Sequence, residues 1–170
     1  MVNQPQQRSA QGSRPQAGQG PRHGPPAGGP PREYEPKTIA YWIDGKPNPA
    51  LMDEEAEAIG RKLALQDQLK PTQLRRHYEA VLNLKNRLDA LEHQYEGGRE
   101  GAFVFLRADF KMLRAKAHYA RGRDPNMFPD SLLHFFCDHV HSVKKAKDFD
   151  IFFKHFQAVV AFHRFYKPKD

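Results

Sequence analysis

The chain has very little cysteine and no long apolar run. Cys137 is the single cysteine among 170 residues, so no disulfide can form within the chain. No apolar stretch approaches the ~20 residues that a membrane-spanning helix needs, and the N-terminus lacks the apolar segment of a secretory signal. These features predict a protein of a reducing compartment. We expect it in the cytoplasm, with no membrane partner.

The sequence also lacks the motifs of common enzyme classes. It has no P-loop, no Gly-rich dinucleotide loop and no nucleophile elbow. His134, Cys137, His139 and His141 could place two pairs of zinc ligands along one helix, but no second ligand pair of the usual spacing occurs elsewhere. We therefore predict no catalytic activity, no metal, no cofactor and no small-molecule substrate.

What the chain does have is positive charge. Its 27 Lys and Arg residues exceed its 20 Asp and Glu residues by seven, and the isoelectric point is about 9.6. An isoelectric point above ~9 is typical of nucleic-acid-binding domains. Residues 1–36 contain four arginines and two glutamates, a net of +2, so +5 of the total +7 belongs to residues 37–170. The predicted domain is itself basic.

Composition divides the chain into two parts. Residues 1–36 are rich in Gln, Pro and Gly and have almost no apolar side chains, which predicts a disordered tail. The tail is either a solvated linker, which its composition favours, or a transient RNA contact through its arginines. Residues 37–170 are predicted to form one domain. Its first segment, residues 37–50 with Trp42, is either an extended arm packed on the domain or a docking segment for a neighbouring subunit.

Apolar residues recur with helical periodicity in five segments of the predicted domain. The segments are residues 53–67, 71–96, 101–121, a stretch from 129 or 130, and a last one after Asp148. No segment shows the alternation of a β-strand. The sequence therefore predicts an all-α fold, a small helical bundle of four to five helices preceded by the disordered N-terminal tail. The phenylalanines follow the helical period, so we expect them in the core rather than stacked on bases.

Basic residues follow a periodicity of their own in the predicted helix 101–121. One face combines Arg107, Lys111, Arg114, His118 and Arg121, while Lys116 and Arg123 lie on a flank. Asp109 is the only acid in the run. Like charges on one helix face repel each other, so we expect an external group to supply negative charge. The face spans roughly 20 Å and favours RNA phosphates as that group; an acidic protein and bulk counter-ions are the alternatives.

Arg75 and Arg76 lie near the start of the predicted helix 71–96. Cations at a helix start oppose the helix dipole. Two interpretations stay open. The arginines converge with backbone amides on an anion, or their stems cover apolar surface.

Three stretches of the chain are similar to the small subunit of type III-A CRISPR (Csm) effector complexes. They are residues 71–79 (PTQLRRHYE), 111–123 (KMLRAKAHYARGR) and 153–166 (FKHFQAVVAFHRFY). Their order and separation agree with that family. The resemblance implies a helical bundle without nuclease activity, several copies of which stack along the guide–target duplex beside the other subunits.

By this resemblance, the first residues expected to contact RNA are Lys111, Arg114, Lys116, Arg121 and Arg123, followed by Arg75 and Arg76. The spacing on the basic face adds Arg107. We therefore predict a subunit that binds the RNA backbone independently of sequence, with guide RNA, target RNA, other subunits and copies of itself as partners. Two rival hypotheses are a protein–protein adaptor whose basic face docks an acidic partner, and a structural DNA-binding bundle.

Overall fold

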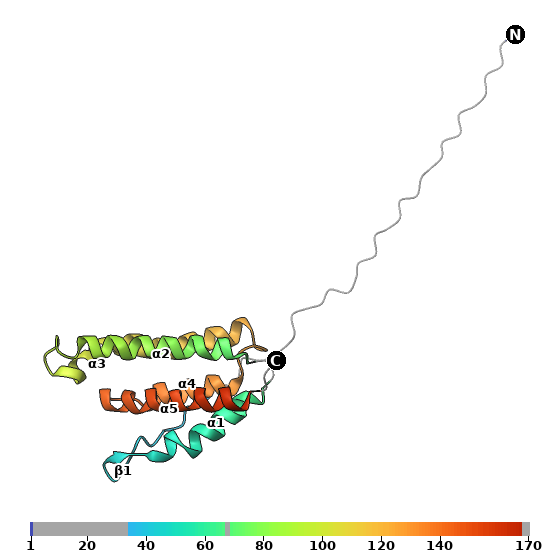
Figure 1. Ribbon diagram of the computed structural model, residues 1–170. Helices are drawn as coiled ribbons and strands as arrows, with labels where there is room; N and C mark the ends of the chain where they lie inside the picture. Colours follow the sequence, from blue (N-terminus) through green and yellow to red (C-terminus); the bar gives the residue numbers. More distant parts are fainter. Residues whose placement is uncertain (2–33, 67–68, 168–170) are drawn as a thin grey trace. The chain divides into compact units, whose positions relative to one another are not determined.

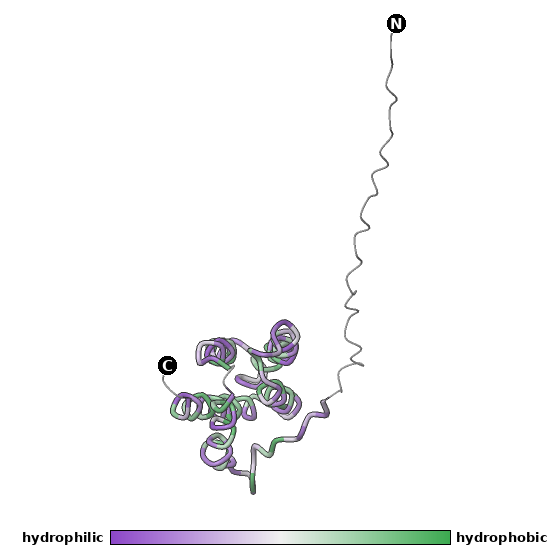
Figure 2. The backbone as a smooth tube through the Cα atoms, turned by 90° about the vertical axis from the view of Figure 1, so that its right-hand side faces the viewer, coloured by the Kyte–Doolittle hydropathy of each residue, from purple (hydrophilic) through white to green (hydrophobic). Residues whose placement is uncertain are grey.

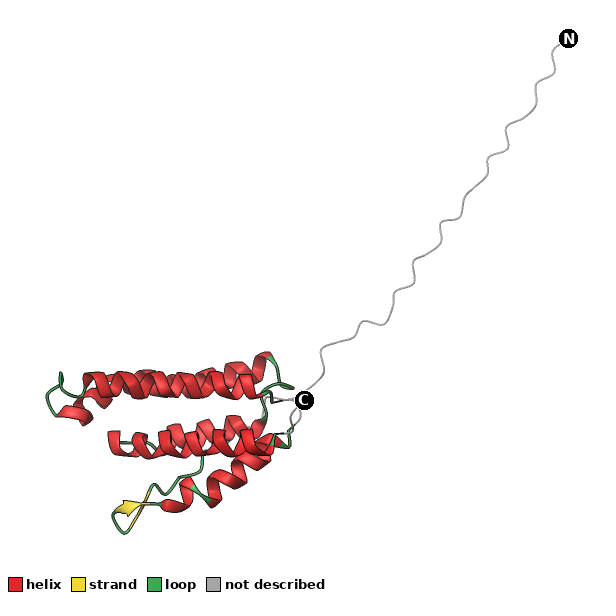
Figure 3. Cartoon of the chain, in the orientation of Figure 1, coloured by secondary structure: helices red, strands yellow, loops and turns green. Residues whose placement is uncertain are grey.

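The computed structural model describes Met1 and residues 34–66 and 69–167. Apart from Met1 and residues 34–36, the predicted tail lies outside the described residues. Figures 1 and 3 show that α-helices dominate the described part, which confirms the predicted all-α class. The five helices are α1 (Glu54–Ala64), α2 (Pro71–Leu91), α3 (Gly98–Arg123), α4 (Asp130–Ser142) and α5 (Ala146–Tyr166).

The connection between α2 and α3 and the start of α5 differ from the prediction, and local interactions explain both. α2 ends at Leu91 rather than near Glu96, and α3 begins at Gly98. The chain reverses between them through Gly97, whose φ of 84° is in the left-handed region that favours glycine. α5 begins at Ala146, before Asp148. The Asp148 carboxylate caps this helix, because its Oδ2 accepts hydrogen bonds from the Lys145 and Lys144 amides, each at 3.0 Å.

α5 is the helix around which the others pack. It contacts α1, α2 and α3, while α3 also packs against α2 and α4. Figure 1 shows α2 and α3 above α4 and α5, with α1 below them. Figure 2 views these helices nearly end-on, with the hydrophobic and hydrophilic parts of each turn visible. Because α2 and α4 lie on either side of it, α3 keeps one long face away from the other helices.

Phenylalanine dominates the core. Phe110, Phe152 and Phe156 are each at most 1% exposed, and burying such a side chain contributes about 1.5–3 kcal/mol. Phe103 and Phe135, also expected in the core, are buried as well. The core prediction is therefore confirmed for these rings. Within the described segments, no helix has both the length and the apolarity to cross a membrane.

The segment before α1 contains a small hairpin that the sequence did not predict. Strand β1 (Trp42–Ile43) pairs with β2 (Lys46–Pro47) in an antiparallel arrangement. Asp44 and Gly45 connect them with φ values of 49° and 74°, as a tight two-residue hairpin turn requires. Each strand has two residues, which is too short for an alternating pattern to show in the sequence. A 3-10 turn, η1 (Pro49–Met52), leads into α1.

Residues 34–48 pack on their own domain as an extended arm. The Tyr41 hydroxyl lies 2.6 Å from His139 Nδ1, and Trp42 Nε1 donates to Asp148 Oδ1 at 2.8 Å. Tyr34 stacks on the His134 ring, with the ring centroids 3.7 Å apart. The extended-arm interpretation therefore describes the structure. Tyr41, at 3% exposed, is a deeper anchor than Trp42, which is only partly buried.

Candidate nucleic-acid interface

The buried side of α3 fixes how its basic residues are presented. Leu106, Phe110 and Leu113 are at most 4% exposed and face the neighbouring helices. Residues at other positions of the 3.6-residue period must therefore face α4, α2 or solvent. The predicted basic face follows the α4 side of the helix, but not every predicted residue belongs to it.

Four cations meet where α3 passes the C-terminal end of α4. We call Arg107, Lys111, Arg114 and Lys144 the α3–α4 cation cluster. Lys111 Nζ donates to the Val140 carbonyl at 2.7 Å, and Arg107 Nη2 donates to the Lys144 carbonyl at 3.1 Å. The C-terminal end of a helix bears partial negative charge. The end of α4 thus holds Lys111 in place, and the loop after it holds Arg107.

The four side chains form no ion pairs in the described segments, although the Asp148 carboxylate accepts a hydrogen bond from the Lys144 backbone amide at 3.0 Å. The pKa of Lys111 lies below its usual value, first because of burial and then because of the like charges of Lys144, Arg107 and Arg114. Within the described part of the chain, no salt bridge involves any of the four residues. Burial raises the pKa of the neighbouring Cys137 thiol, while Arg114 acts in the opposite direction. The cluster therefore concentrates positive charge on side chains that have no ion-pair partner in the described part of the chain.

Arg121 was predicted to belong to the basic face, but the structure engages it internally. Its Nε donates to Asp130 Oδ1 at 2.6 Å and its Nη2 to Asp130 Oδ2 at 3.2 Å. Nη1 also donates to the Pro125 carbonyl. The guanidinium therefore closes the connection between α3 and α4. Asp130, nine residues further along, is the signal in the sequence that could have indicated this pairing.

Lys116 and Arg123 lie on the other exposed side of α3, toward α2. Five residues separate Lys111 from Lys116, which turns the side chain by about 140° around the helix. On that side Asp109 accepts a hydrogen bond from Arg87 of α2 at 2.7 Å. Lys116 and Arg123 therefore do not extend the α3–α4 cation cluster.

The structure brings Arg123 together with Arg76 instead. Both line a cleft of about 260 Å³ between the start of α2 and the end of α3, which His77 and Phe128 also line. Burial lowers the pKa of His77 to about 4. Arg75 points elsewhere, because its Nε donates to Glu79 Oε1 at 2.9 Å in an exposed pair. The two adjacent arginines thus face different surroundings.

The possible zinc ligands on α4 have different surroundings and do not converge on one point. His134 stacks on Tyr34, His139 is buried against Tyr41, and His141 is exposed. Among the residues that the structure describes, no group of three or more His, Cys, Asp or Glu side chains is arranged to bind a metal ion.

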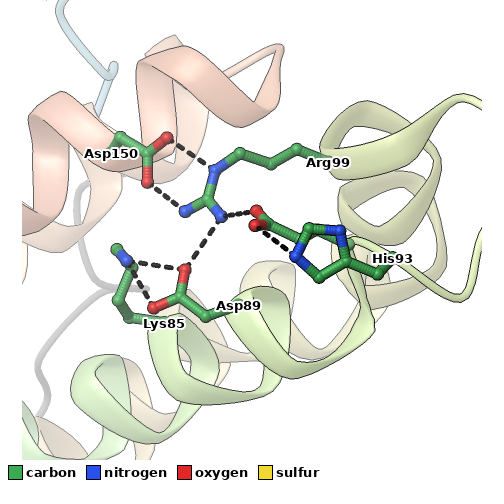
Figure 4. A network of polar contacts seen from close by, with 6 residues as sticks. Lys85, Asp89, His93, Arg99 and Asp150 are labelled. Atoms are coloured by element: carbon green, nitrogen blue, oxygen red, sulfur yellow. Dashed lines mark hydrogen bonds and ion pairs between the residues drawn. The ribbon is translucent and has the colours of Figure 1, made fainter.

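A second polar network, at the other end of α3, joins three helices. Figure 4 shows Arg99 of α3 between Asp89 of α2 and Asp150 of α5, with Lys85 on the far side of Asp89. Burial raises the pKa of Asp89, but hydrogen bonds from Lys85 and Arg99 outweigh that effect and lower it. Because acids surround this arginine, the network stabilises the fold rather than presenting charge to a ligand.

The fold and the site define a small basic helical bundle whose longest described helix displays a cluster of cations. The family model Csm2 Type III-A matches residues 46–169. The chain therefore belongs to the Csm2 family, the small subunit of type III-A CRISPR complexes, and the predicted resemblance is confirmed. The match begins in β2 and includes all five helices. No curated protein and no solved structure matched the chain.

Proposed function

We propose that the chain is a non-catalytic subunit that binds the RNA backbone within a cytoplasmic type III-A effector complex. Guide RNA and target RNA are its nucleic-acid partners, and the other subunits and copies of itself are its protein partners. The membership in the Csm2 family supports the place in the complex. The α3–α4 cation cluster supports the contact with RNA.

We base the proposal on the α3–α4 cation cluster because its geometry suits phosphate groups. Arg107 and Arg114 are two turns apart, about 10 Å along the helix axis, and are both exposed. Each guanidinium can hold a phosphate with two donors. Backbone contacts contain no sequence information, so base pairing between guide and target would determine which RNA is bound.

The non-catalytic part of the proposal rests on how the histidines are used. His139 and His155 are each 1% exposed and pack against Phe135 in the core. Burial lowers the pKa of both rings. They are core groups of the bundle and do not face the cation cluster as general acids or bases.

The experiment that tests this proposal is RNA binding over a salt series, measured by fluorescence anisotropy. The probes are an oligouridine strand and an A-form RNA duplex. The variant changes Arg107, Arg114 and Lys144 to Gln and keeps Lys111, whose ammonium group stabilises the end of α4. Each lost phosphate contact lowers the slope of log K against log salt by about 0.7–0.9. We expect the triple variant to lose two to three such contacts.

Lys62→Gln is the matched control, because Lys62 is an exposed lysine of α1. A folded triple variant that binds RNA as the wild type does would overturn the proposed site. Because the control removes one cation and the variant removes three, an equal loss per removed charge would attribute binding to net charge alone. Preference for one base at high salt would contradict sequence-independent binding, and a duplex DNA competitor that displaces RNA would favour the DNA-binding rival.

The predicted RNA contacts of Arg75, Arg76, Lys116 and Arg123 require a test of their own. Their side chains lie away from the α3–α4 cation cluster. Changing Arg76 and Arg123 to Gln removes both cations of the shared cleft. A decrease in the salt slope of that variant would show that RNA reaches around the end of the bundle, whereas an unchanged slope would restrict binding to the cluster.

A further inference from the structure

A cleft of about 530 Å³ lies between the first three turns of α2 and the end of α5. We call it the α2–α5 cleft. Its apolar wall includes Tyr78 and Leu82 of α2 and Val160 of α5. Ligand pockets typically have volumes of ~300–1,000 Å³, apolar walls and a few polar groups that orient the ligand. The α2–α5 cleft therefore has the size and the lining of a site for a small organic molecule.

His163 of α5 is the buried polar residue of this cleft. It lines the cleft although it is only 1% exposed, so its imidazole ring belongs to the floor rather than to the rim. Within the described part of the chain, the His163 Nε2 atom is buried and has no hydrogen-bond partner. Buried polar side-chain atoms nearly always have a partner, because an unpaired one loses its hydration without compensation. The ring therefore indicates that a polar group from outside the chain completes the cleft.

The surroundings of this ring are positively charged. Arg164 is exposed and lines the cleft, and among the residues that the structure describes it takes part in no salt bridge. Lys167, one turn after His163, donates to the Gln66 carbonyl at 3.3 Å. Burial, followed by the charges of Lys167 and Arg164, lowers the pKa of His163. Both cations therefore act on the ring, and they favour an anionic ligand beside it.

The start of α2 adds to this positive charge. The N-terminal end of a helix bears partial positive charge and is a common place for phosphate groups, and Pro71, the first residue of α2, lines the cleft. Glu79 is the acid of the lining, but Arg75 Nε donates to it at 2.9 Å. A phosphate monoester carries nearly two negative charges at neutral pH. It therefore suits Arg164 and the helix end, while the apolar wall suits a planar body attached to it.

We propose that the α2–α5 cleft binds a nucleoside monophosphate, with the phosphate between Arg164 and the start of α2 and the base against Tyr78 and Val160. His163 Nε2 carries the proton of the neutral ring and donates it to an acceptor atom of the ligand. The cleft is formed by α2 and α5, so the proposal does not rest on the α3–α4 cation cluster and goes beyond the proposed function. The nucleotide is either free or the phosphorylated end of an RNA strand.

Titration of the full, isotopically labelled chain with AMP tests the proposal. Heteronuclear NMR of the histidine rings follows His163, and calorimetry gives the Kd. Adenosine and inorganic phosphate are titrated separately, because each offers only one half of the expected contacts. We expect AMP to shift the ring nitrogen resonances of His163 and to bind at least tenfold more tightly than adenosine or inorganic phosphate.

Two variants locate the binding site. Arg164→Gln removes the exposed cation and should weaken AMP binding at least fivefold. Val160→Phe fills the cleft with a larger side chain and should abolish the binding, while the melting temperature shows that the variant is folded. Lys154→Gln is the matched control, because Lys154 is an exposed cation of the same helix that lies nearly three turns from Arg164. It should bind AMP as the wild type does.

The source of the nucleotide is tested with two oligoadenylate strands, one with a terminal phosphate and one with a terminal hydroxyl group. A gain in affinity from the phosphate that Arg164→Gln abolishes identifies an RNA end as the ligand. AMP binding without such a gain identifies the free nucleotide. The cation cluster is tested separately through the salt slope of RNA binding, so failure of the proposed function and failure of this site are distinguishable.

Three results would overturn the proposal. If millimolar AMP and the phosphorylated strand both leave His163 unshifted, the ring is satisfied by a buried water only. Equal affinities for AMP and inorganic phosphate would exclude a contact with the base. If the Arg107, Arg114 and Lys144 triple variant loses AMP binding while Arg164→Gln keeps it, the nucleotide binds at the α3–α4 cation cluster instead.

Discussion

Arg99 donates two parallel hydrogen bonds to Asp150, from Nε to Oδ2 at 2.8 Å and from Nη2 to Oδ1 at 2.6 Å. The same guanidinium donates to Asp89 at 2.8 Å and to Glu92 (Figure 4). Arg99 lies in the first turn of α3, where the helix dipole disfavours a cation. The surrounding carboxylates outweigh that cost, and they join the end of α2 and the start of α5 to α3.

We expect Asp150→Asn to lower the free energy of unfolding by about 1.5–3 kcal/mol, the range for hydrogen bonds to charged groups. The substitution keeps the shape of the side chain and removes its charge. Glu79→Gln is the control, because it disrupts an exposed i, i+4 pair with Arg75 that contributes about 0.3–0.5 kcal/mol. Urea unfolding at neutral pH measures both. Equal losses would show that the Arg99 network is no more stabilising than a surface pair.

Gly60 is a point of close approach between α1 and α5. A Cβ added there would lie 2.6 Å from Phe162 Cβ and 2.9 Å from the Val159 carbonyl oxygen. Gly60→Ala must therefore push the two helices apart, and we expect a loss of at least 2 kcal/mol, within the ~1–3 kcal/mol range of overpacked cores. In α3, Gly122 has nothing within 4 Å of its added Cβ. Gly122→Ala should instead stabilise the protein by up to about 1 kcal/mol. Thermal unfolding of the two variants gives the signs, and a stabilising Gly60→Ala would contradict the packing of α1.

The helices were predictable because each has a regular apolar stripe. The Leu74, Val81 and Leu88 stripe of α2 is buried as its spacing predicts, since the period of a helix determines which side chains share a face. Periodicity does not indicate which other element of the fold packs beside a given face of the helix. Lys144 joins the cation cluster from the loop after α4, although in the sequence it is 30 residues beyond Arg114.

The same limitation explains why the ion pair of Arg121 was not expected. Arg121 has the spacing of the basic face, but the turn after α3 brings Asp130 back to it. Likewise, the sequence does not indicate that Met112 faces outward, because methionine fits a helix core as well as a surface. The packing of α3 against α2 and α4 leaves Met112 51% exposed.

Arg114 and Arg121 should therefore separate RNA binding from stability. We expect Arg121→Gln to lower the melting temperature, because it removes the bidentate pair with Asp130, and to leave the salt slope of RNA binding unchanged. Arg114→Gln should lower the salt slope and leave the melting temperature unchanged. Arg114 has no salt bridge in the described part of the chain. Thermal unfolding and anisotropy on the same preparations measure the two effects. A lower salt slope in Arg121→Gln would return that residue to the RNA-contacting face.

The pH dependence of stability should come from buried histidines. Burial, followed by the charge of His155, lowers the pKa of His139 well below its usual value, and burial also lowers the pKa of His77, to about 4. Each ring is thus neutral in the folded protein and binds a proton more readily when unfolded. Their contribution to stability is complete above the unfolded pKa of ~6.5 and decreases by about 1.4 kcal/mol per pH unit and per histidine below it.

We expect Trp42 fluorescence to report this loss of stability. The Tyr41 hydroxyl lies 2.6 Å from His139 Nδ1, and Trp42, the single tryptophan, is the residue that follows Tyr41. Urea unfolding followed by Trp42 fluorescence should show stability decreasing as the pH falls from about 6.5 to about 4. His139→Gln cannot take up the proton, so its stability should depend less steeply on pH. His93→Gln is the control, since the His93 side chain is 85% exposed. If the His139 and His93 variants keep the same pH slope as the wild type, protonation of His139 does not limit stability in acid, and the carboxylates of the Arg99 network become the groups to test.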